Sequence, residues 1–135
     1  MVEMGLAGSR VSASIGVADI RRSATFYEGV LGLVLARVDP SAGVAEGARH
    51  YACGHGTVLH VFETPTAGST HSTVATWSVD DIDTVTRELT AAGAELVRYE
   101  GIGQDPRGIG PRAGGGRIAW VKDPDGNTLA IEADN

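Results

Sequence analysis

The sequence predicts an α+β domain made of two βαβββ modules that together form a curved mixed sheet around a concave cavity. Three observations support this prediction. The chain of 135 residues, 42% of them hydrophobic, is long enough to bury one core, so residues 1–135 are expected to form a single domain. A run rich in β-branched residues precedes a helical pattern twice, and further strand patterns follow each helix. Residues of the first half also recur in the second half at constant spacing.

The first module, expected over residues 10–64, begins with a strand that ends at Asp19. Asp19 is the predicted N-cap of a helix, because its carboxylate can accept the free N–H groups of a first helical turn. Gly32 then marks the helix end. The apolar residues between these two positions recur at helical spacing, at Ile20, Ala24, Tyr27 and Leu31. The remaining strands are expected at 33–38, 49–53 and 57–63.

The second module, expected over residues 71–135, repeats the same order of elements. Asp81 stands where the helix should start, and Gly93 stands where it should end. The apolar positions between them have helical spacing, at Ile82, Val85, Leu89 and Ala92. The later strands are expected at 95–99, 117–122 and 127–132.

Matching residues indicate that the chain is an internal duplication, with residues 65–70 as the linker between its halves. Val17, Asp19 and Ile20 recur at an offset of 62, as Val79, Asp81 and Ile82. Leu59 and Val61 recur at an offset of 70, as Leu129 and Ile131. A half of this size buries little core alone, so the two halves are expected to pack together, with helices on one face and a concave ligand-binding interior on the other.

Charge and cysteine content narrow the class of protein. A formal net charge of −6 repels phosphate backbones and anionic lipids, so neither nucleic acid nor membrane is an expected partner. The single cysteine, Cys53, permits no internal disulfide, which favours a reducing, cytoplasmic location. Residues 1–10 lack the basic and apolar regions of a signal peptide. Pairing of Cys53 with the nearby His55 as a nucleophile and base is a minor alternative, since no orienting carboxylate is evident.

Two motifs identify a family resemblance that covers nearly the whole chain. The first is VADIRRSATFYEGVLGL at 17–33, which leads from a strand into a helix, and the second is WVKDPDGN at 120–127, a hairpin turn before the last strand. With the paired βαβββ modules, they resemble the vicinal oxygen chelate (VOC) superfamily. That superfamily includes glyoxalase I, bleomycin-resistance proteins, extradiol dioxygenases and fosfomycin-resistance enzymes. The resemblance implies the VOC fold and a homodimer, but the motifs themselves describe architecture rather than chemistry.

Metal-dependent relatives take their ligands from the first and last strand of each module, and the resemblance maps these four places onto this chain. The mapped residues are Ser12, His60, Val74 and Ala130. His60 is the one good donor among them, because Val and Ala have none and a neutral Ser hydroxyl is a poor ligand. We therefore expect neither the superfamily metal nor another cofactor, as in bleomycin-resistance-like members. The alternative is a shifted metal site formed by His60 with Glu132, which has the same strand parity as Ala130.

His60 is the central candidate functional residue. Strand alternation places it on one face with Val58 and Phe62, toward the predicted interior, where an imidazole could bind a ligand or act as a general base. A structural histidine remains the alternative. The other candidate ligand contacts are aromatic walls, a rim tyrosine, a loop arginine and a strand serine, namely Tyr51, Phe62, Trp120, Tyr99, Arg112 and Ser12. Trp77 has the opposite parity to Val74 and is expected in the core.

Residues 101–117 hold seven glycines and three arginines, which is unusual for a connection of this length. One interpretation is a mobile lid that brings Arg107 or Arg112 to an anionic group of a ligand. The other is a solvated, flexible connection. The spacing of its glycines does not fit a nucleotide-binding fingerprint.

Together these features predict a glyoxalase/bleomycin-resistance-like protein that binds a small organic, antibiotic-like molecule in the concave sheet. The alternative is an enzyme, a lyase, isomerase or dioxygenase of the glyoxalase type, with His60 as metal ligand or general base. A third alternative is an accessory domain that recruits another protein. The resemblance leaves the ligand unspecified.

Overall fold

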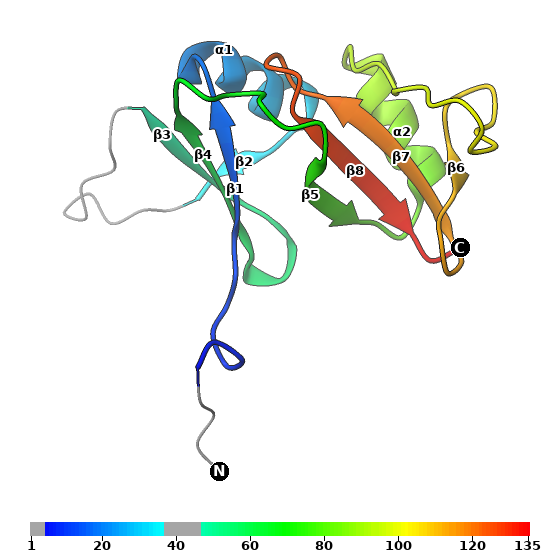
Figure 1. Cartoon of the computed structure of the whole chain (residues 1–135), viewed down its shortest axis with the longest axis horizontal. Helices are drawn as coiled ribbons and strands as arrows, with labels where there is room; N and C mark the ends of the chain where they lie inside the picture. The colour runs from blue at the N-terminus through cyan, green and yellow to red at the C-terminus, as the bar shows by residue number, and fades with distance from the viewer. Residues whose placement is uncertain (1–4, 37–46) are drawn as a thin grey trace.

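The computed structural model describes residues 5–36 and 47–135, and it shows two modules that each contain a four-stranded mixed sheet and one α-helix (Figure 1). The first sheet has the order β1-β4-β3-β2 and the second the order β5-β8-β7-β6. In each, the first and last strands of the module pair in parallel, and the other pairs are antiparallel. The prediction of an α+β fold with two βαβββ modules is confirmed. The modules form two separate sheets rather than a closed barrel, with β1 and β5 as neighbours.

The bounds of the elements follow the predicted order in both modules. The first module comprises β1 (Ala13–Val17), α1 (Ile20–Ala24), β2 (Val34–Leu35), β3 (Ala48–Ala52) and β4 (Val58–Glu63). The second comprises β5 (Thr73–Ser78), α2 (Ile82–Ala91), β6 (Gly110–Pro111), β7 (Arg117–Lys122) and β8 (Thr128–Ala133). None of the helices in the described parts of the chain is both long and apolar enough to span a membrane.

The helix starts lie where the sequence predicts them. The Asp19 carboxylate accepts the N–H groups of Arg21 and Arg22 at 2.9 and 3.2 Å, and Asp81 accepts that of Thr84 at 3.1 Å. These bonds satisfy donors that have no partner within the helix. Gly32 and Gly93 follow the helices with φ of 72° and 110°, a conformation that glycine adopts without steric cost.

The first helix departs from regular α geometry in its second half. After Ala24 the chain continues as a π-helical segment over Thr25–Val30, in which the Leu31 N–H donates to the Phe26 carbonyl. The wider turn still directs Tyr27 inward, where its side chain is fully buried. The predicted helix through Leu31 is therefore present, with a change of hydrogen-bond pattern that apolar spacing does not reveal.

The predicted strand at 95–99 is wrong, and the edge of the second sheet is formed by β6 instead. Within this segment one isolated bridge joins Leu96 to Val121. The side chain of Gln104 takes the place of a strand partner, because its amide nitrogen donates to the Val97 carbonyl and its oxygen accepts the Tyr99 N–H. The side-chain amide thus forms the hydrogen bonds that a neighbouring strand would otherwise form with this backbone. For the predicted strand at 33–38, β2 covers its centre, and residues 37 and 38 lie outside the described residues.

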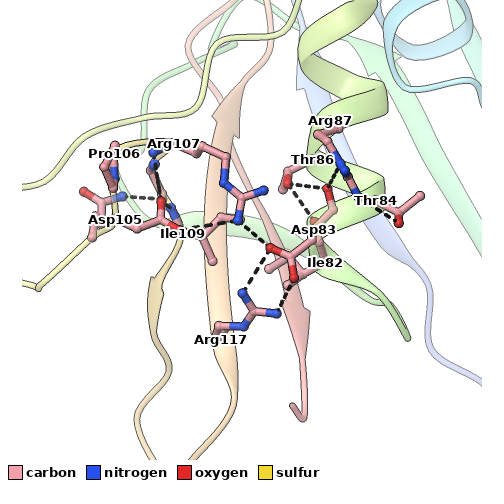
Figure 2. A network of polar contacts seen from close by, with 12 residues as sticks. Ile82, Asp83, Thr84, Thr86, Arg87, Asp105, Pro106, Arg107, Ile109 and Arg117 are labelled. Carbon is pink, nitrogen blue, oxygen red and sulfur yellow. Dashed lines mark hydrogen bonds and ion pairs between the residues drawn. The ribbon is translucent and has the colours of Figure 1, made fainter.

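The glycine-rich segment 101–117 is packed against the second module rather than left as a solvated connection. Ile109 is 3% exposed within it. Asp105 closes a turn by accepting the N–H groups of residues 107–109. Figure 2 shows the next contact, in which Arg107 and Arg117 both bind the Asp83 carboxylate of α2, at 2.5 and 2.8 Å. Ion pairs with Asp83 therefore join the segment to α2, and the buried Ile109 side chain packs it against the core.

We expect Asp83→Asn to lower the melting temperature by a few degrees at neutral pH, and by progressively less as the pH falls below about 4. Hydrogen bonds from Arg117 and Arg107 hold the pKa of the Asp83 carboxyl well below its ordinary value of about 3.9. Its contribution to stability is therefore full at neutral pH, declines below about pH 4 and is lost as the pH falls through the lowered pKa. Melting curves of both proteins between about pH 7 and 3 check this, and a difference that grows in acid would contradict it.

The two modules meet at the turn between β7 and β8. Asp123, 5% exposed, accepts the hydroxyl proton of Tyr27 from the first module at 2.8 Å. Asn127 donates its side-chain amide to the Gly16 carbonyl at 2.8 Å, and Asp125 pairs with Arg22 at 2.5 Å. Because turn and helix come from different halves of the chain, these contacts fix how the halves pack.

Candidate functional site

Each sheet has one face toward the core and one face away from it. In the first module the core face holds the buried residues Ile15, Val17, Tyr51, Leu59 and Val61. Strand alternation and pairing place a second set on the opposite face, which we call the first open face: Ser14, Gly16, Val34, Ala48, His50, Ala52, Val58, His60 and Phe62. The predicted grouping of His60 with Val58 and Phe62 agrees with this pairing.

A second histidine lies beside His60 on this face. His50 of β3 is paired directly with His60 of β4, and the two rings stack with centroids 4.4 Å apart at an interplanar angle of 29°. Both residues are half-buried. Sequence reasoning missed His50 because the face of its strand could not be assigned. The sequence offers one signal. His50 and Tyr51 are adjacent in their strand and so lie on opposite faces, and a Tyr51 assigned to the core would have placed His50 on the open face.

Phe62 occupies the same face next to the histidine pair, and it is 41% exposed. It is paired with Gly16 of β1, and a Cβ at Gly16 would lie 3.8 Å from the Phe62 ring. Because Gly16 has no side chain, the Phe62 ring lies over bare backbone at this position. The face therefore offers an exposed aromatic ring and two imidazoles on one patch, which suits stacking and hydrogen bonding to a planar molecule.

The other predicted aromatic contacts are on the second module. Trp120 of β7 is paired with Ala130 of β8, and the Tyr99 ring meets it edge to face, with centroids 5.1 Å apart. Ala130 is 1% exposed. Thus Trp120 and Tyr99 come together, as a cluster on the second sheet, separate from the histidine pair on the first.

Tyr51 lies in the core, which removes it from the candidate ligand contacts. It is fully buried, stacks on Tyr27 with ring centroids 6.1 Å apart, and donates its hydroxyl proton to Glu28 at 2.9 Å. Burial, followed by the hydrogen bond to Glu28, raises the pKa of this phenol. Its pairing with Leu59 gives it the core parity that the sequence left undecided. Trp77, by contrast, has the core-facing parity that was expected, paired with Ile131.

The loop arginines are neutralised within the protein. Arg112 binds Asp134 at 2.7 Å and lies 3.5 Å from Glu132. Arg107 and Arg117 are bound by Asp83, as Figure 2 shows. These pairs raise the pKa of each guanidinium and satisfy its charge. Neither Arg107 nor Arg112 is held ready for an anionic ligand in this arrangement.

The donor set does not fit the metal centre of the metal-dependent relatives. Of the four mapped positions, Ser12, Val74 and Ala130 offer at most one weak hydroxyl donor beside His60. Glu132, the residue of the shifted alternative, lies on the second sheet and is engaged by Arg112 and by Ser78. Within residues 5–36 and 47–135, no three His, Cys, Asp or Glu side chains gather as a metal site.

Two of the hollows beside the first module include Val58 of the first open face in their lining. One, of about 720 Å³, lies between residues 9–12, residues 55–58 and His60. The other, of about 330 Å³, lies between the two modules and is lined by Val11–Ala13, Cys53 and β5 residues 75–78. Ser12 lines both, so this predicted contact stands at the junction of the two spaces. Volumes in this range match those of small-molecule sites.

Comparison with known proteins places the chain in a family. The family model described as Glyoxalase/Bleomycin resistance protein/Dioxygenase superfamily matches residues 10–131. A search of curated proteins found no match.

Solved structures give a consistent result. The antibiotic binding protein TnmS3 from Streptomyces sp. CB03234 is 26% identical, with 97% of this chain and 100% of that chain covered and a TM-score of 0.69. A glyoxalase/bleomycin resistance protein from the same Streptomyces strain is 27% identical, with 88% and 95% covered and a TM-score of 0.62. The fosfomycin resistance protein FosX from Listeria monocytogenes, 14% identical with 95% and 94% covered and a TM-score of 0.64, shares the fold.

Proposed function

Because the chain belongs to the Glyoxalase/Bleomycin resistance protein/Dioxygenase superfamily, we propose that it binds a small organic, antibiotic-like molecule on the first open face. The likeness to an antibiotic binding protein at 26% identity supports this class of ligand. The proposal includes the expectation that binding needs no superfamily metal centre, since the mapped positions supply one good donor, His60.

The observation that carries the proposal is the exposed Phe62 ring beside the His50 and His60 imidazoles. A planar ligand that covers Phe62 removes apolar surface from water and gains a stacking contact, and the imidazoles can donate or accept hydrogen bonds at its edge. The adjoining hollow of about 720 Å³ gives room for the rest of the molecule. The site therefore suits an aromatic molecule with polar substituents.

Charge favours a neutral or cationic ligand. The net charge is −6, and the arginines of the segment 101–117 are occupied by carboxylates of the protein. These arginines are therefore not available to an anionic ligand, and the overall field attracts a cation.

We further propose that the protein acts as a homodimer in the cytoplasm. Exposed apolar side chains that a partner subunit could cover support the dimer: Leu6 is 85% exposed, Val11 88% and Val34 69%. The single cysteine, which has no partner for an internal disulfide, supports a reducing compartment.

The test is a thermal-shift screen of planar aromatic antibiotics, followed by affinity measurement on the strongest compound. At one hundred times its Kd, a true ligand stabilises the fold by about 2.7 kcal/mol, a shift of several degrees. Phe62→Ala is expected to weaken its affinity about tenfold, because one aromatic contact and its buried area are lost. Leu35→Ala, which also removes exposed apolar surface but has the opposite parity on the edge strand β2, is the matched control and should bind as the wild type does.

Two results would contradict the proposal. One is a screen in which no compound raises the melting temperature above the spread of the controls. The other is a ligand whose affinity is unchanged in Phe62→Ala, because it would place binding away from the first open face.

A further inference from the structure

We propose that His50 and His60 form a chelating site for a divalent transition metal, with Cu²⁺ and Ni²⁺ preferred. This site differs from the metal centre of metal-dependent relatives, because its ligands are neighbours on β3 and β4 of one sheet rather than residues from four strands of two modules. It shares the first open face with the proposed organic ligand, whose binding requires no metal.

The backbone hydrogen-bond pattern between β3 and β4 makes His50 and His60 a pair of the closely spaced kind. Glu63 donates its N–H to the Gly47 carbonyl, so that pair is hydrogen-bonded across β3 and β4. Pairs alternate along an antiparallel ladder, which makes the pair of His50 with His60, three residues further along, a non-hydrogen-bonded one. The His50 carbonyl indeed accepts from Ala36, on the side away from β4. Side chains of such pairs approach most closely.

The ring separation matches what one metal ion requires. A metal bound to two imidazole nitrogens at about 2.0–2.1 Å, with an angle near 90° between them, holds the ring centroids roughly 4.5 Å apart. The rings of His50 and His60 have centroids 4.4 Å apart. The rings stack at 29° to one another, so binding requires that both rotate about their side-chain bonds until one nitrogen of each faces a shared ion. Right-angled nitrogen pairs are typical of tetragonal Cu²⁺ and Ni²⁺ sites, and Cu²⁺ also binds most tightly in the divalent series.

The surroundings leave the other coordination positions open. Ser14 lies beside His60 on β1, Ala48 and Phe62 form the next cross-strand pair, and His60 lines the hollow of about 720 Å³. Arg10, which lines the same hollow, is the cationic side chain on that side. Water or an oxygen donor could complete the coordination from this space. A two-histidine site of this kind binds moderately and exchanges its metal, because two protein ligands are fewer than structural sites use.

Isothermal titration of the untagged full-length protein with CuCl₂, NiCl₂ and ZnCl₂ tests the site. We expect one ion per chain, with affinity falling from Cu²⁺ to Ni²⁺ to Zn²⁺. His50→Gln and His60→Gln should each weaken Cu²⁺ binding about tenfold or more, because a chelate is reduced to a single ligand. His71→Gln, which alters an exposed histidine outside this hollow, is the matched control and should bind as the wild type does.

A spectroscopic readout separates chelation from misfolding. The electron paramagnetic resonance spectrum of the Cu²⁺ protein should show coupling to two nitrogens, reduced to one in either variant of the pair, while melting curves confirm that both variants are folded. Cu²⁺ affinity that survives His50→Gln, or that falls equally in His71→Gln, would overturn the site. Either result leaves the organic-ligand proposal intact, since that proposal is tested by the Phe62→Ala comparison without metal.

Discussion

Replacing Asp123 with alanine is expected to lower the free energy of unfolding by about 3–5 kcal/mol, because four hydrogen bonds end on this one buried carboxylate. One oxygen accepts the N–H groups of Asp125 and Asn127, at 2.9 and 2.8 Å. The other accepts the Tyr27 hydroxyl and the Asn127 side-chain amide, both at 2.8 Å. Alanine leaves the Tyr27 hydroxyl and the two backbone N–H groups without a partner in a region that water reaches poorly, while the Asn127 amide keeps its bond to the Gly16 carbonyl. Urea unfolding followed by circular dichroism measures the loss.

Two further variants make the comparison specific. Tyr27→Phe removes one of the four donors and keeps the carboxylate, so we expect a loss of about 1 kcal/mol. Glu100→Ala removes an exposed carboxylate and should stay within about 0.5 kcal/mol of the wild type. A loss in Asp123→Ala no larger than that in Tyr27→Phe would mean that the turn re-forms its hydrogen bonds with water.

Replacing Gly68 with alanine is expected to destabilise the protein by about 3 kcal/mol or more, through the same turn. Gly68 has φ of 69°, and a Cβ there would lie 2.1 Å from the backbone carbonyl oxygen of Asp125. The left-handed conformation alone costs a non-glycine residue about 1–2 kcal/mol, and overlap with backbone adds a comparable or larger penalty because neither segment can yield cheaply. Denaturant unfolding of the variant measures the sum.

Gly101→Ala is the matched control for this substitution. Gly101 has φ of 79°, similar to that of Gly68, but a Cβ there would meet no atom within 4 Å. Its expected cost is therefore the conformational part alone, about 1–2 kcal/mol. Equal losses in the two variants would show that the linker moves away from the turn without cost, and that the packing of Gly68 against Asp125 is unimportant.

Both substitutions act on the place where the two halves meet. The Asp125 carboxylate accepts a hydrogen bond from the Ala18 N–H at 3.2 Å and forms an ion pair with the Arg22 guanidinium. The Asn127 side-chain amide donates a hydrogen bond to the Gly16 carbonyl. The sequence motif at 120–127, which marks the family resemblance, is thus a hairpin turn whose polar side chains also join the modules. Its role is architectural, because these contacts hold the first module against the second.

The sequence by itself determined the elements whose causes are local. Asp19 and Asp81 start the two helices because a cap needs its own side chain and the next few N–H groups, all within four residues. The offset between the halves likewise predicted the repeated order of strands and helices, and alternation along β4 correctly grouped His60 with Phe62 on one face. Each of these inferences depends on neighbours in the chain.

Tertiary structure alone decided what depends on partners distant in sequence. Alternation shows which residues of a strand share a face, but the direction of that face depends on pairing with another strand. For this reason Tyr51 was placed at the site although it lies in the core, and His50 was missed although it stacks on His60. The segment at 95–99 is not a strand, because the Gln104 side chain forms hydrogen bonds with its backbone N–H and carbonyl groups. No pattern of residues in the sequence predicts such a contact. The pairing of β3 with β4 brought two histidines, separated by a turn, within reach of one ligand.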